Sequence, residues 1–376
     1  MVPCVGPGGS SVGCDGPSEM ARSPAVTFVI MAGGRGERLW PLVRTHTPKV
    51  CLSTDGKQTL LCATIERLRP VWPRATWLIV TTQEQAEAVR AGLASALRRA
   101  VLVEPQIKNT AACITVAAVA LAARDPRRVM VVVPADHWVG DVRAFQRCLR
   151  AAIRAAVTYD TIATIGIHPT HPHPGLGYLR AGTALAAFRS PRAFRLARFV
   201  EKPSATAARR LIRQGRTYWN SGIFVGTADK FLECVTEWLP DHTRRLVPLA
   251  GRLESGTFTR RARGAYRALE AVSFDHGVMD HVHGGVVVEG RFPWADLGSW
   301  DTWARLSRGA GRTVAIESRN ITVVSQDEHL VATIGVRDLV VVHTPSATLI
   351  CPTDRAQAVR KVTQRLAATP RLAAYR

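Results

Sequence analysis

The sequence lacks the features that mark secreted and membrane proteins. Its 8 cysteines are scattered without any CxxC pair, so neither a disulfide framework nor a zinc site is indicated, and a reduced cytoplasm fits best. No stretch approaches the roughly 20 apolar residues that a membrane-spanning helix needs, and residues 1–24 have no basic start or apolar core of a secretory signal. We therefore expect a cytoplasmic protein with no membrane partner.

Acidic residues are also scarce. The chain has 29 Asp and Glu against 50 Lys and Arg, a net charge of +21, which would suit nucleic acid, an acidic membrane surface or small anionic substrates. However, there is no block of five consecutive basic residues and no zinc-finger or aromatic-platform pattern. We attribute the excess to solvated basic faces and expect no nucleic-acid partner. Tight, steeply salt-dependent binding to random duplex DNA would contradict this interpretation.

The order of elements predicts an α/β fold. A strand at 26–31 is followed by a glycine-rich turn and a helix near 59–68. Further strands at 77–80, 101–103, 129–133 and 161–167 are separated by helices at 84–97, 110–123 and 142–156. Such alternation is typical of a doubly wound sheet covered by helices. Strands near 194–200, 222–226 and 285–289 are less regularly spaced, so we expect a mixed, mostly parallel sheet.

The ends of the chain differ from this pattern. Residues 1–24 are rich in Gly, Pro and Ser, and we expect a disordered extension, with Met20 as an alternative start. From about Arg312 short strands follow one another, and a helix begins near Asp354. We therefore predict a large domain over 25–308 and a small β-rich domain with a terminal helix over 309–376.

The glycine-rich turn predicts phosphate binding. It contains Gly33, Gly34, Gly36 and Arg38, and Lys49 follows in a Thr-Pro-Lys segment. Glycines let backbone N–H groups approach phosphate oxygens, and the two cationic side chains can neutralise a triphosphate. A dinucleotide-binding motif is excluded because Leu39 replaces its third glycine, and no GxxxxGK[ST] loop occurs. An ordinary strand-to-helix turn is the alternative.

Two aspartates are candidates for a magnesium site. Asp136 ends an apolar strand, at the sheet edge where open α/β folds bind ligands, and Asp296 lies in a Trp-rich segment. Two carboxylate oxygens leave room for water and phosphate around Mg²⁺. A helix cap or a turn explains either residue alone about as well.

Two later segments suggest substrate contacts. Glu201 can accept from sugar hydroxyls, Lys202 can pair with a phosphate, and Asn220 can donate and accept. A surface ion pair and a turn are the alternatives. The histidines His168, His171 and His173 lie in a Pro-rich segment without acidic or Cys partners at ligand spacing. A solvated loop explains them more simply than a metal site, so we leave them out of the site.

The ordered motifs give these candidates a context. Along the chain occur AGGRGERLWPL with TPK, EPQIKNTAA, PADH, GLGYL, VEKP, WNSGIF, SFDHGVMDH and WADLGSW. In order and spacing this series resembles the bacterial mannose-1-phosphate guanylyltransferase family. The resemblance implies the nucleotidyltransferase fold, related to the glycosyltransferase-A fold, followed by a left-handed β-helix-like domain. It also implies GTP and mannose 1-phosphate as substrates and Mg²⁺ as cofactor.

Carried over position by position, the resemblance also assigns roles to residues. It implies that the triphosphate lies on Gly33, Gly34, Gly36, Arg38 and Lys49, and that Mg²⁺ lies on Asp136 and Asp296. Asn109 and Thr110 would lie beside the nucleoside. The sugar-phosphate side would be lined by Gly177, Tyr178, Glu201, Lys202, Asn220 and Asp275.

Some choices stay open at this point. Arg180 and His281 stand where family members usually carry an acidic residue and a Lys, so heptose 1-phosphate or glucose 1-phosphate is an alternative substrate. A subunit that senses nucleotide sugars without catalysis is a second alternative, against which the intact Lys49, Asp136 and Asp296 argue. The residues do not fix the oligomeric state, and a homodimer is compatible with them.

Overall fold

A computed structural model describes residues 23–53, 56–252, 258–306 and 311–376 of the chain. Most of the predicted N-terminal extension, residues 1–22, and the predicted domain boundary at 308/309 lie outside the described residues. Within these ranges, none of the helices is long and apolar enough to cross a bilayer.

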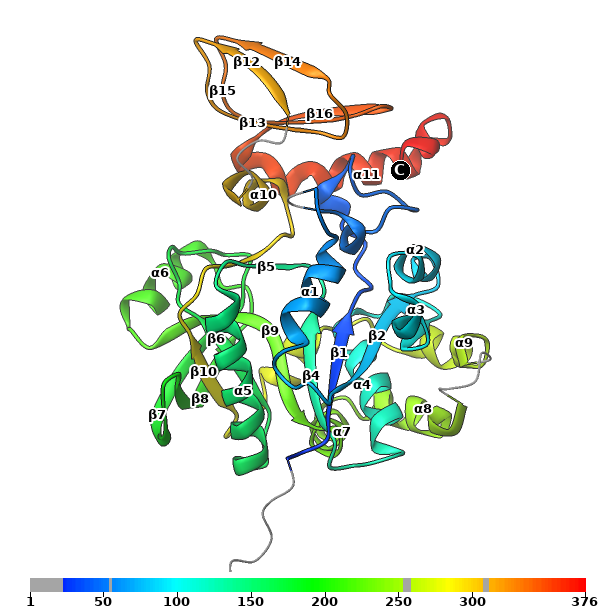
Figure 1. Cartoon of the computed structure of the whole chain (residues 1–376), viewed down its shortest axis with the longest axis vertical. Coiled ribbons are helices and arrows are strands. Elements are labelled where there is room, and N and C mark those ends of the chain that lie inside the picture. The colour runs from blue at the N-terminus through cyan, green and yellow to red at the C-terminus, as the bar shows by residue number, and fades with distance from the viewer. Residues whose placement is uncertain (1–22, 54–55, 253–257, 307–310) are drawn as a thin grey trace, which may run out of the picture.

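The centre of the molecule is a nine-stranded sheet, seen together with its helices in Figure 1. In spatial order the strands are β3 (Val101–Glu104), β2 (Thr76–Thr82), β1 (Val26–Met31), β4 (Val129–Pro134), β9 (Thr217–Thr227), β6 (Ala163–Ile167), β10 (Val286–Gly290), β8 (Arg192–Val200) and β7 (Tyr178–Arg189). The first four run parallel, and β10 runs parallel to β6. Strand β9 is antiparallel to both β4 and β6, so β6 has the same direction as β4. The expected mixed, mostly parallel sheet is confirmed.

Helices cover both faces of this sheet. The central strands are buried apolar segments such as VTFVIM in β1 and VMVVVP in β4, which is typical of strands covered on both sides. One core contains side chains of α1 (Leu60–Leu68), α2 (Ala86–Ala91) and α5 (Val142–Tyr159), and the other contains side chains of α4 (Asn109–Ala122), α7 (Ala228–Trp238), α8 (Pro240–Leu246) and α9 (Phe258–Ala268). The fold is therefore doubly wound, as predicted.

Two short strands lie next to the large sheet. Strand β5 (His137–Val139) follows β4 directly and pairs antiparallel with β11 (Trp294–Asp296). The remaining short helices are α3 (Ser95–Arg98), α6 (Ala205–Arg213), α10 (Trp300–Leu306), η1 (Glu37–Leu39), η2 (Lys49–Cys51), η3 (Val247–Arg252) and the π-helical η4 (Asp275–Met279). The segment predicted as one helix over 84–97 forms two helices, because α2 ends at Ala91 with Gly92 as its cap.

The last part of the chain is β-rich, as expected. Strand β12 (Arg312–Ile316) pairs in parallel with β14 (Leu330–Ile334), and β13 (Arg319–Ser325) pairs in parallel with β15 (Arg337–Thr344), which is antiparallel to β16 (Ala347–Pro352). The helices η5 (Thr353–Ala358), α11 (Val359–Ala368) and η6 (Pro370–Tyr375) follow. In Figure 1, α11 lies between these sheets and the loop after β1.

The two parts share a third apolar core. Leu39, Trp40 and Trp300 belong to the same cluster as Val340 and Val342 of β15. The indole of Trp300 donates to the carbonyl of Trp40 over 2.9 Å, and the indole of Trp40 donates to the carbonyl of Tyr375 over 2.8 Å. The glycine-rich loop is therefore packed against the C-terminal helices.

Candidate active site

The glycine-rich loop begins where β1 ends, at the carboxyl edge of the parallel strands. Gly36 has a φ of +61°, a conformation that residues with a side chain rarely adopt. A Cβ there would lie 3.0 Å from Cβ of Lys49 and 3.1 Å from Cγ1 of Val43. Glycine at this position thus lets the loop containing Gly33 and Gly34 pack closely against Lys49.

Lys49 lies between two carboxylates. Its Nζ donates to Oδ2 of Asp136 over 2.6 Å and to Oδ1 of Asp296 over 3.4 Å, and the residue is only 5% exposed. Burial disfavours the ammonium, but attraction to Asp136 and Asp296 outweighs burial, and the pKa of Lys49 is raised. Lys49 is therefore charged at neutral pH.

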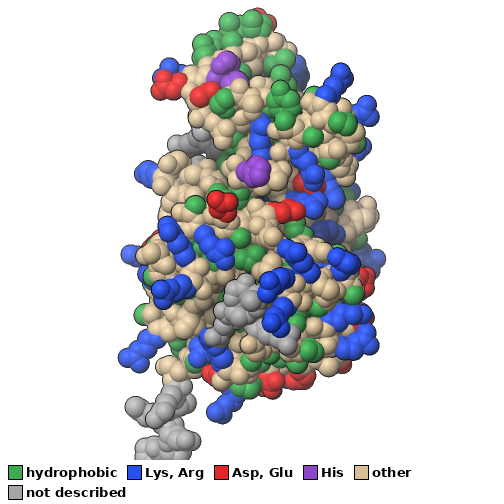
Figure 2. All heavy atoms as spheres, turned by 90° about the vertical axis from the view of Figure 1, so that its right-hand side faces the viewer, with side chains coloured by type: hydrophobic (Ala, Val, Ile, Leu, Met, Phe, Trp, Pro, Cys, Tyr) green, Lys and Arg blue, Asp and Glu red, His purple; other side chains and the backbone are tan. Residues whose placement is uncertain are grey.

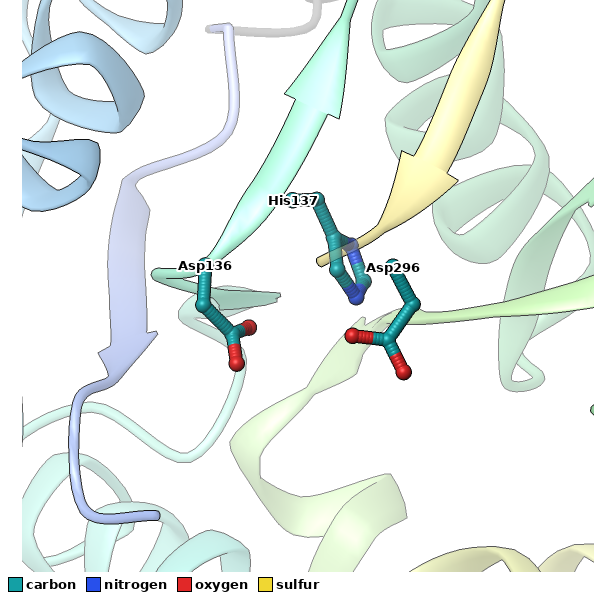
Figure 3. Close-up of side chains that lie close together, drawn as sticks. All are labelled: Asp136, His137 and Asp296. Carbon is teal, nitrogen blue, oxygen red and sulfur yellow. The ribbon is translucent and has the colours of Figure 1, made fainter. Parts of the chain in front are cut away.

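Strand pairing brings the two aspartates together. Asp136 lies between β4 and β5, and Asp296 ends β11, where it pairs with His137 in the antiparallel register. Ligand atoms of Asp136, His137 and Asp296 all lie within 4.8 Å of one another. Figure 3 shows the three side chains grouped at this point. The juxtaposition that the sequence predicted for Asp136 and Asp296 is present.

This group fits a divalent cation. The ammonium of Lys49 already lies against both carboxylates, so their arrangement favours positive charge. Carboxylate oxygens are the ligands that Mg²⁺ prefers. Burial lowers the pKa of His137, which keeps its imidazole neutral, and its buried Nδ1 has no hydrogen-bond partner among the described residues. The described residues thus offer two hard oxygen ligands and a neutral neighbour.

Sequence reasoning missed a buried arginine beneath this group. Arg67 of α1 is 8% exposed and donates to the carbonyl of His137 over 2.8 Å and to the hydroxyl of Thr64. Burial lowers its pKa to about 10, partly opposed by Asp136, so the guanidinium stays charged. Nothing in the helical pattern of α1 distinguishes Arg67 from an exposed arginine.

A cavity of about 650 Å³ opens beside the carboxylates. Asp296 and His137 line it together with Asn220 and Asp275. Of the predicted sugar-side residues, the ones that line it are Gly177, Glu201, Lys202, Asn220 and Asp275. Its size suits a sugar phosphate or a larger ligand.

Hydrogen bonds join several of the residues that line this cavity. Nδ2 of Asn220 donates to Oδ1 of Asp275 over 2.5 Å, and Nζ of Lys202 donates to Oε1 of Glu201 over 2.5 Å. A Cβ on Gly177 would lie 2.6 Å from Oε2 of Glu201. Burial, followed by repulsion from Glu201, raises the pKa of Asp275 to about 6. Two carboxylates, an amide and an ammonium therefore line this cavity.

Tyr178 and the loop that contains His171 and His173 lie next to these cavity-lining residues. Tyr178 is fully buried, and its hydroxyl accepts from the backbone N–H of His173 and from the indole of Trp219. The rings of His171 and Trp219 lie 5.0 Å apart, and both His171 and His173 line the cavity. His168 is exposed, as expected of a solvated loop, whereas His171 and His173 are half-buried and line the cavity.

Asn109 and Thr110 lie at the start of α4, apart from the cavity. Asn109 has a φ of +65°, and its Oδ1 accepts from the N–H of Thr110 over 2.9 Å. The Thr110 hydroxyl accepts from the N–H of Phe274 over 2.8 Å. Thr110 thus fixes the segment that contains Asp275, and its place beside a nucleoside stays a prediction.

Arg38 also lines the cavity but makes an unforeseen contact. Its Nη1 donates to Oε1 of Gln357 over 2.7 Å. Gln357 belongs to η5 in the C-terminal part, so a residue far along the sequence reaches the glycine-rich loop. No motif pointed to Gln357.

The basic surface has no single stripe on the face shown in Figure 2. Lys and Arg side chains are spread over this face, and Asp and Glu are fewer. The excess positive charge is therefore not confined to the cavity.

Fold and site together define a class of enzyme. A doubly wound sheet has at its carboxyl edge a glycine-rich loop, a buried lysine between two aspartates and a polar cavity. This combination is that of an enzyme acting on phosphorylated substrates.

The chain belongs to the nucleotidyl transferase family. The model of that family, "Nucleotidyl transferase", matches residues 27–311, and a model named "MannoseP isomerase/GMP-like beta-helix domain" matches residues 311–366. The second match confirms the β-helix-like character that was expected of the C-terminal part. The chain is accordingly a sugar-phosphate nucleotidyltransferase.

Individual relatives support the same family assignment. A mannose-1-phosphate guanylyltransferase from Escherichia coli K12 is 35% identical over 91% of this chain and 74% of its own length, and ManC from Salmonella typhimurium LT2 is 34% identical over 91% and 73%. A crystal structure from Thermus thermophilus, described as a mannose-1-phosphate geranyltransferase, superposes with a TM-score of 0.79 at 35% identity, covering 91% of this chain and 99% of that one. The chain thus spans about three quarters of the two curated relatives.

Proposed function

We propose that this chain joins GTP and mannose 1-phosphate to give GDP-mannose and pyrophosphate. The observation that carries the proposal is the position of Lys49, whose Nζ lies 2.6 Å from Asp136 and 3.4 Å from Asp296 beside a polar cavity. The names of the curated relatives supply the two substrates. The proposal is supported by the closeness of these charged groups to Asp296, which lines the cavity together with Glu201, Asn220 and Asp275.

The chemistry is a phosphoryl-group displacement. An anionic oxygen of the sugar phosphate attacks the α-phosphorus of GTP. The bond from this phosphorus to the oxygen that bridges the α- and β-phosphates breaks, and pyrophosphate leaves with the electron pair of that bond. No general base is needed, because the sugar phosphate is already ionised near neutral pH. The protein has instead to bring two anions together and to stabilise the charge that develops during the transfer.

Named side chains divide this task. We assign Arg38, Lys49 and the N–H groups at Gly33, Gly34 and Gly36 to the triphosphate. Asp136 and Asp296 would hold Mg²⁺, which supplies positive charge to phosphate oxygens when it is bound.

The sugar side has its own group of residues. Lys202 would face the sugar phosphate, and Glu201, Asn220 and Asp275 would accept or donate to hydroxyls, since these side chains line the cavity. Gly177 leaves the space that this wall needs, and Tyr178 supports it from behind. We place the nucleoside beside Asn109 and Thr110, at the start of α4.

The domain division belongs to the same proposal. We assign residues 25–308 to the catalytic domain and 309–376 to the small C-terminal domain, in a protein of the cytoplasm. The free cysteines Cys113 and Cys148, both buried, suit that compartment.

Pyrophosphate release tests the proposal. Purified chain is incubated with Mg²⁺, GTP and mannose 1-phosphate, with parallel reactions that contain ATP, glucose 1-phosphate, heptose 1-phosphate or no sugar. We expect release only with GTP and mannose 1-phosphate. Release with another pair would retain the mechanism and change the substrate. No release with any pair would contradict the enzyme assignment and favour a sensing subunit.

A further inference from the structure

Gln357 connects two loops of the site from outside the large sheet. It lies in η5 and lines the same cavity as Asp296 and Arg38. Its Oε1 accepts from Nη1 of Arg38 over 2.7 Å, while its Nε2 donates to Oγ of Ser299 over 2.9 Å. One amide thus joins the glycine-rich loop to the segment that follows Asp296.

The chemistry of this bridge requires an amide. Arg38 offers only donors, whereas Ser299 donates its own proton to Oδ1 of Asp301 over 2.5 Å and so presents an acceptor to Gln357. Nε2 of Gln357 also lies 3.5 Å from that Asp301 oxygen. A carboxylate in place of the amide would face Asp301, and an ammonium would face Arg38. The side chain has to accept at one end and donate at the other.

The helix α11, which follows η5 directly, is fixed against the glycine-rich loop. Nε of Arg360 lies 3.2 Å from Oε2 of Glu37, and Glu37 directly precedes Arg38 in the sequence. The indole of Trp40 donates to the Tyr375 carbonyl, and Leu39 shares a core with Val359 of α11. Several independent contacts therefore hold η5 and α11 in place beside the glycine-rich loop.

We propose that Gln357 is a positioning residue that orients the Arg38 guanidinium toward the triphosphate. The inference rests on the proposed function, in which Arg38 binds that triphosphate. A guanidinium carries several N–H donors in a fixed plane, so the bond from Nη1 to Gln357 restrains the position of the group and leaves other donors for phosphate oxygens. The C-terminal domain thereby contributes to nucleotide binding without touching the nucleotide.

The test replaces Gln357 by leucine in the full chain. Gln357→Leu approximates the shape of the side chain and removes its hydrogen bonds to Arg38, Ser299 and Asp301. Because Gln357 is exposed, we expect an unchanged thermal midpoint. The KM for GTP and the Kd for GTP, measured by calorimetry without sugar, should rise about fivefold, as expected for one hydrogen bond to a charged group near the surface. The KM for mannose 1-phosphate should change by less than about twofold.

Gln214→Leu is the matched control. Oε1 of Gln214 accepts from Nη1 of Arg180 over 2.9 Å at an exposed position. The control therefore removes the same kind of amide–guanidinium hydrogen bond at a place away from the cavity. This variant should bind GTP like the wild type. If Gln357→Leu behaves like Gln214→Leu, the positioning role is overturned.

A double-mutant cycle then identifies the partner. In an Arg38→Ala background, Gln357→Leu should cause no further loss of GTP affinity, because the group that it orients is gone. A loss of the same size in both backgrounds would overturn the proposal. If the wild type binds GTP but releases no pyrophosphate, the proposed function fails while the affinities still decide the role of Gln357. A wild type that binds no GTP would overturn both.

Discussion

The Nζ of Lys49 donates to Oδ2 of Asp136 over 2.6 Å, although 87 positions separate the two residues. Lys49 begins η2 after the glycine-rich loop, and Asp136 follows β4, the parallel neighbour of β1. Because the carboxyl ends of parallel strands meet at one edge, the two residues meet where β1 and β4 end. Asp296 lies at the same edge because β11 pairs with β5.

Replacing Lys49 by methionine should reduce kcat/KM by about 10²-fold or more, since it removes a preorganised charge from the site. It also leaves Asp136 and Asp296 without their buried counterion. Steady-state pyrophosphate release measures the loss, and circular dichroism checks that the variant is folded.

Lys230→Met is the matched control for this variant. Lys230 also lies between two carboxylates, 3.3 Å from Asp160 and 2.5 Å from Glu233, but outside the cavity-lining residues. Its loss should leave kcat/KM within about twofold of the wild type, as is usual for surface ion pairs. Equal activity of Lys49→Met and Lys230→Met would remove Lys49 from the catalytic group.

A chelator should abolish activity, and added Mg²⁺ should restore it. Asp136→Asn and Asp296→Asn each remove one hard anionic ligand, so we expect the Mg²⁺ concentration for half-maximal rate to rise about tenfold or more in both variants. Asp241→Asn, an exposed change on α8, is the control. Unaltered Mg²⁺ dependence in both site variants would show that the cation is held elsewhere.

Much of the frame was predictable from the sequence, for physical reasons. Buried parallel strands such as β1 and β4 are continuous apolar runs, and the turn after β1 needs glycine at Gly36. Strand β7, by contrast, was not predicted. Its sequence, YLRAGTALAAFR, is rich in alanine and has little of the β-branched character typical of strands, and its pairing with β8 and β9 determines its conformation.

The residues of the site likewise divide into those that the sequence indicated and those that it did not. Asp136 and Asp296 were found because each follows or ends a strand, and a sheet edge collects such residues. Gln357, Arg67 and the pair His171 and His173 depend on how distant segments pack, and no local pattern records that packing. Arg38 was predicted as a phosphate ligand, but its bond to Gln357 follows only from the docking of η5.

Gly177→Ala should weaken binding of the sugar phosphate. The new Cβ would lie 2.6 Å from Oε2 of Glu201 and 3.3 Å from Cβ of Asn220, which is too close for the present wall to accommodate. We expect KM for mannose 1-phosphate to rise about tenfold while KM for GTP stays within about twofold. Gly264→Ala, at an exposed position of α9 where a Cβ would meet nothing within 4 Å, is the control. A rise in the KM of GTP alone would contradict the placement of the sugar.

Asp275→Asn should change how stability depends on pH. Burial and the nearby Glu201 raise the pKa of Asp275 to about 6 in the folded chain, against an ordinary value of 3.8. Between these values the folded protein binds a proton that the unfolded chain has released, so raising the pH through this window lowers the free energy of unfolding. The side chain is partly exposed, so we expect a loss of about 2 kcal/mol, somewhat less than the pKa difference alone implies.

An asparagine at this position can still accept from Asn220 but does not ionise, so the variant should escape this loss. Urea unfolding at several values between about pH 4 and 7, the window set by the two pKa values, measures both proteins, with Asp241→Asn as control. The wild type should lose stability relative to Asp275→Asn as the pH rises, because only the wild type must ionise this half-buried carboxyl. A constant difference between the two curves would show that Asp275 does not titrate in this range.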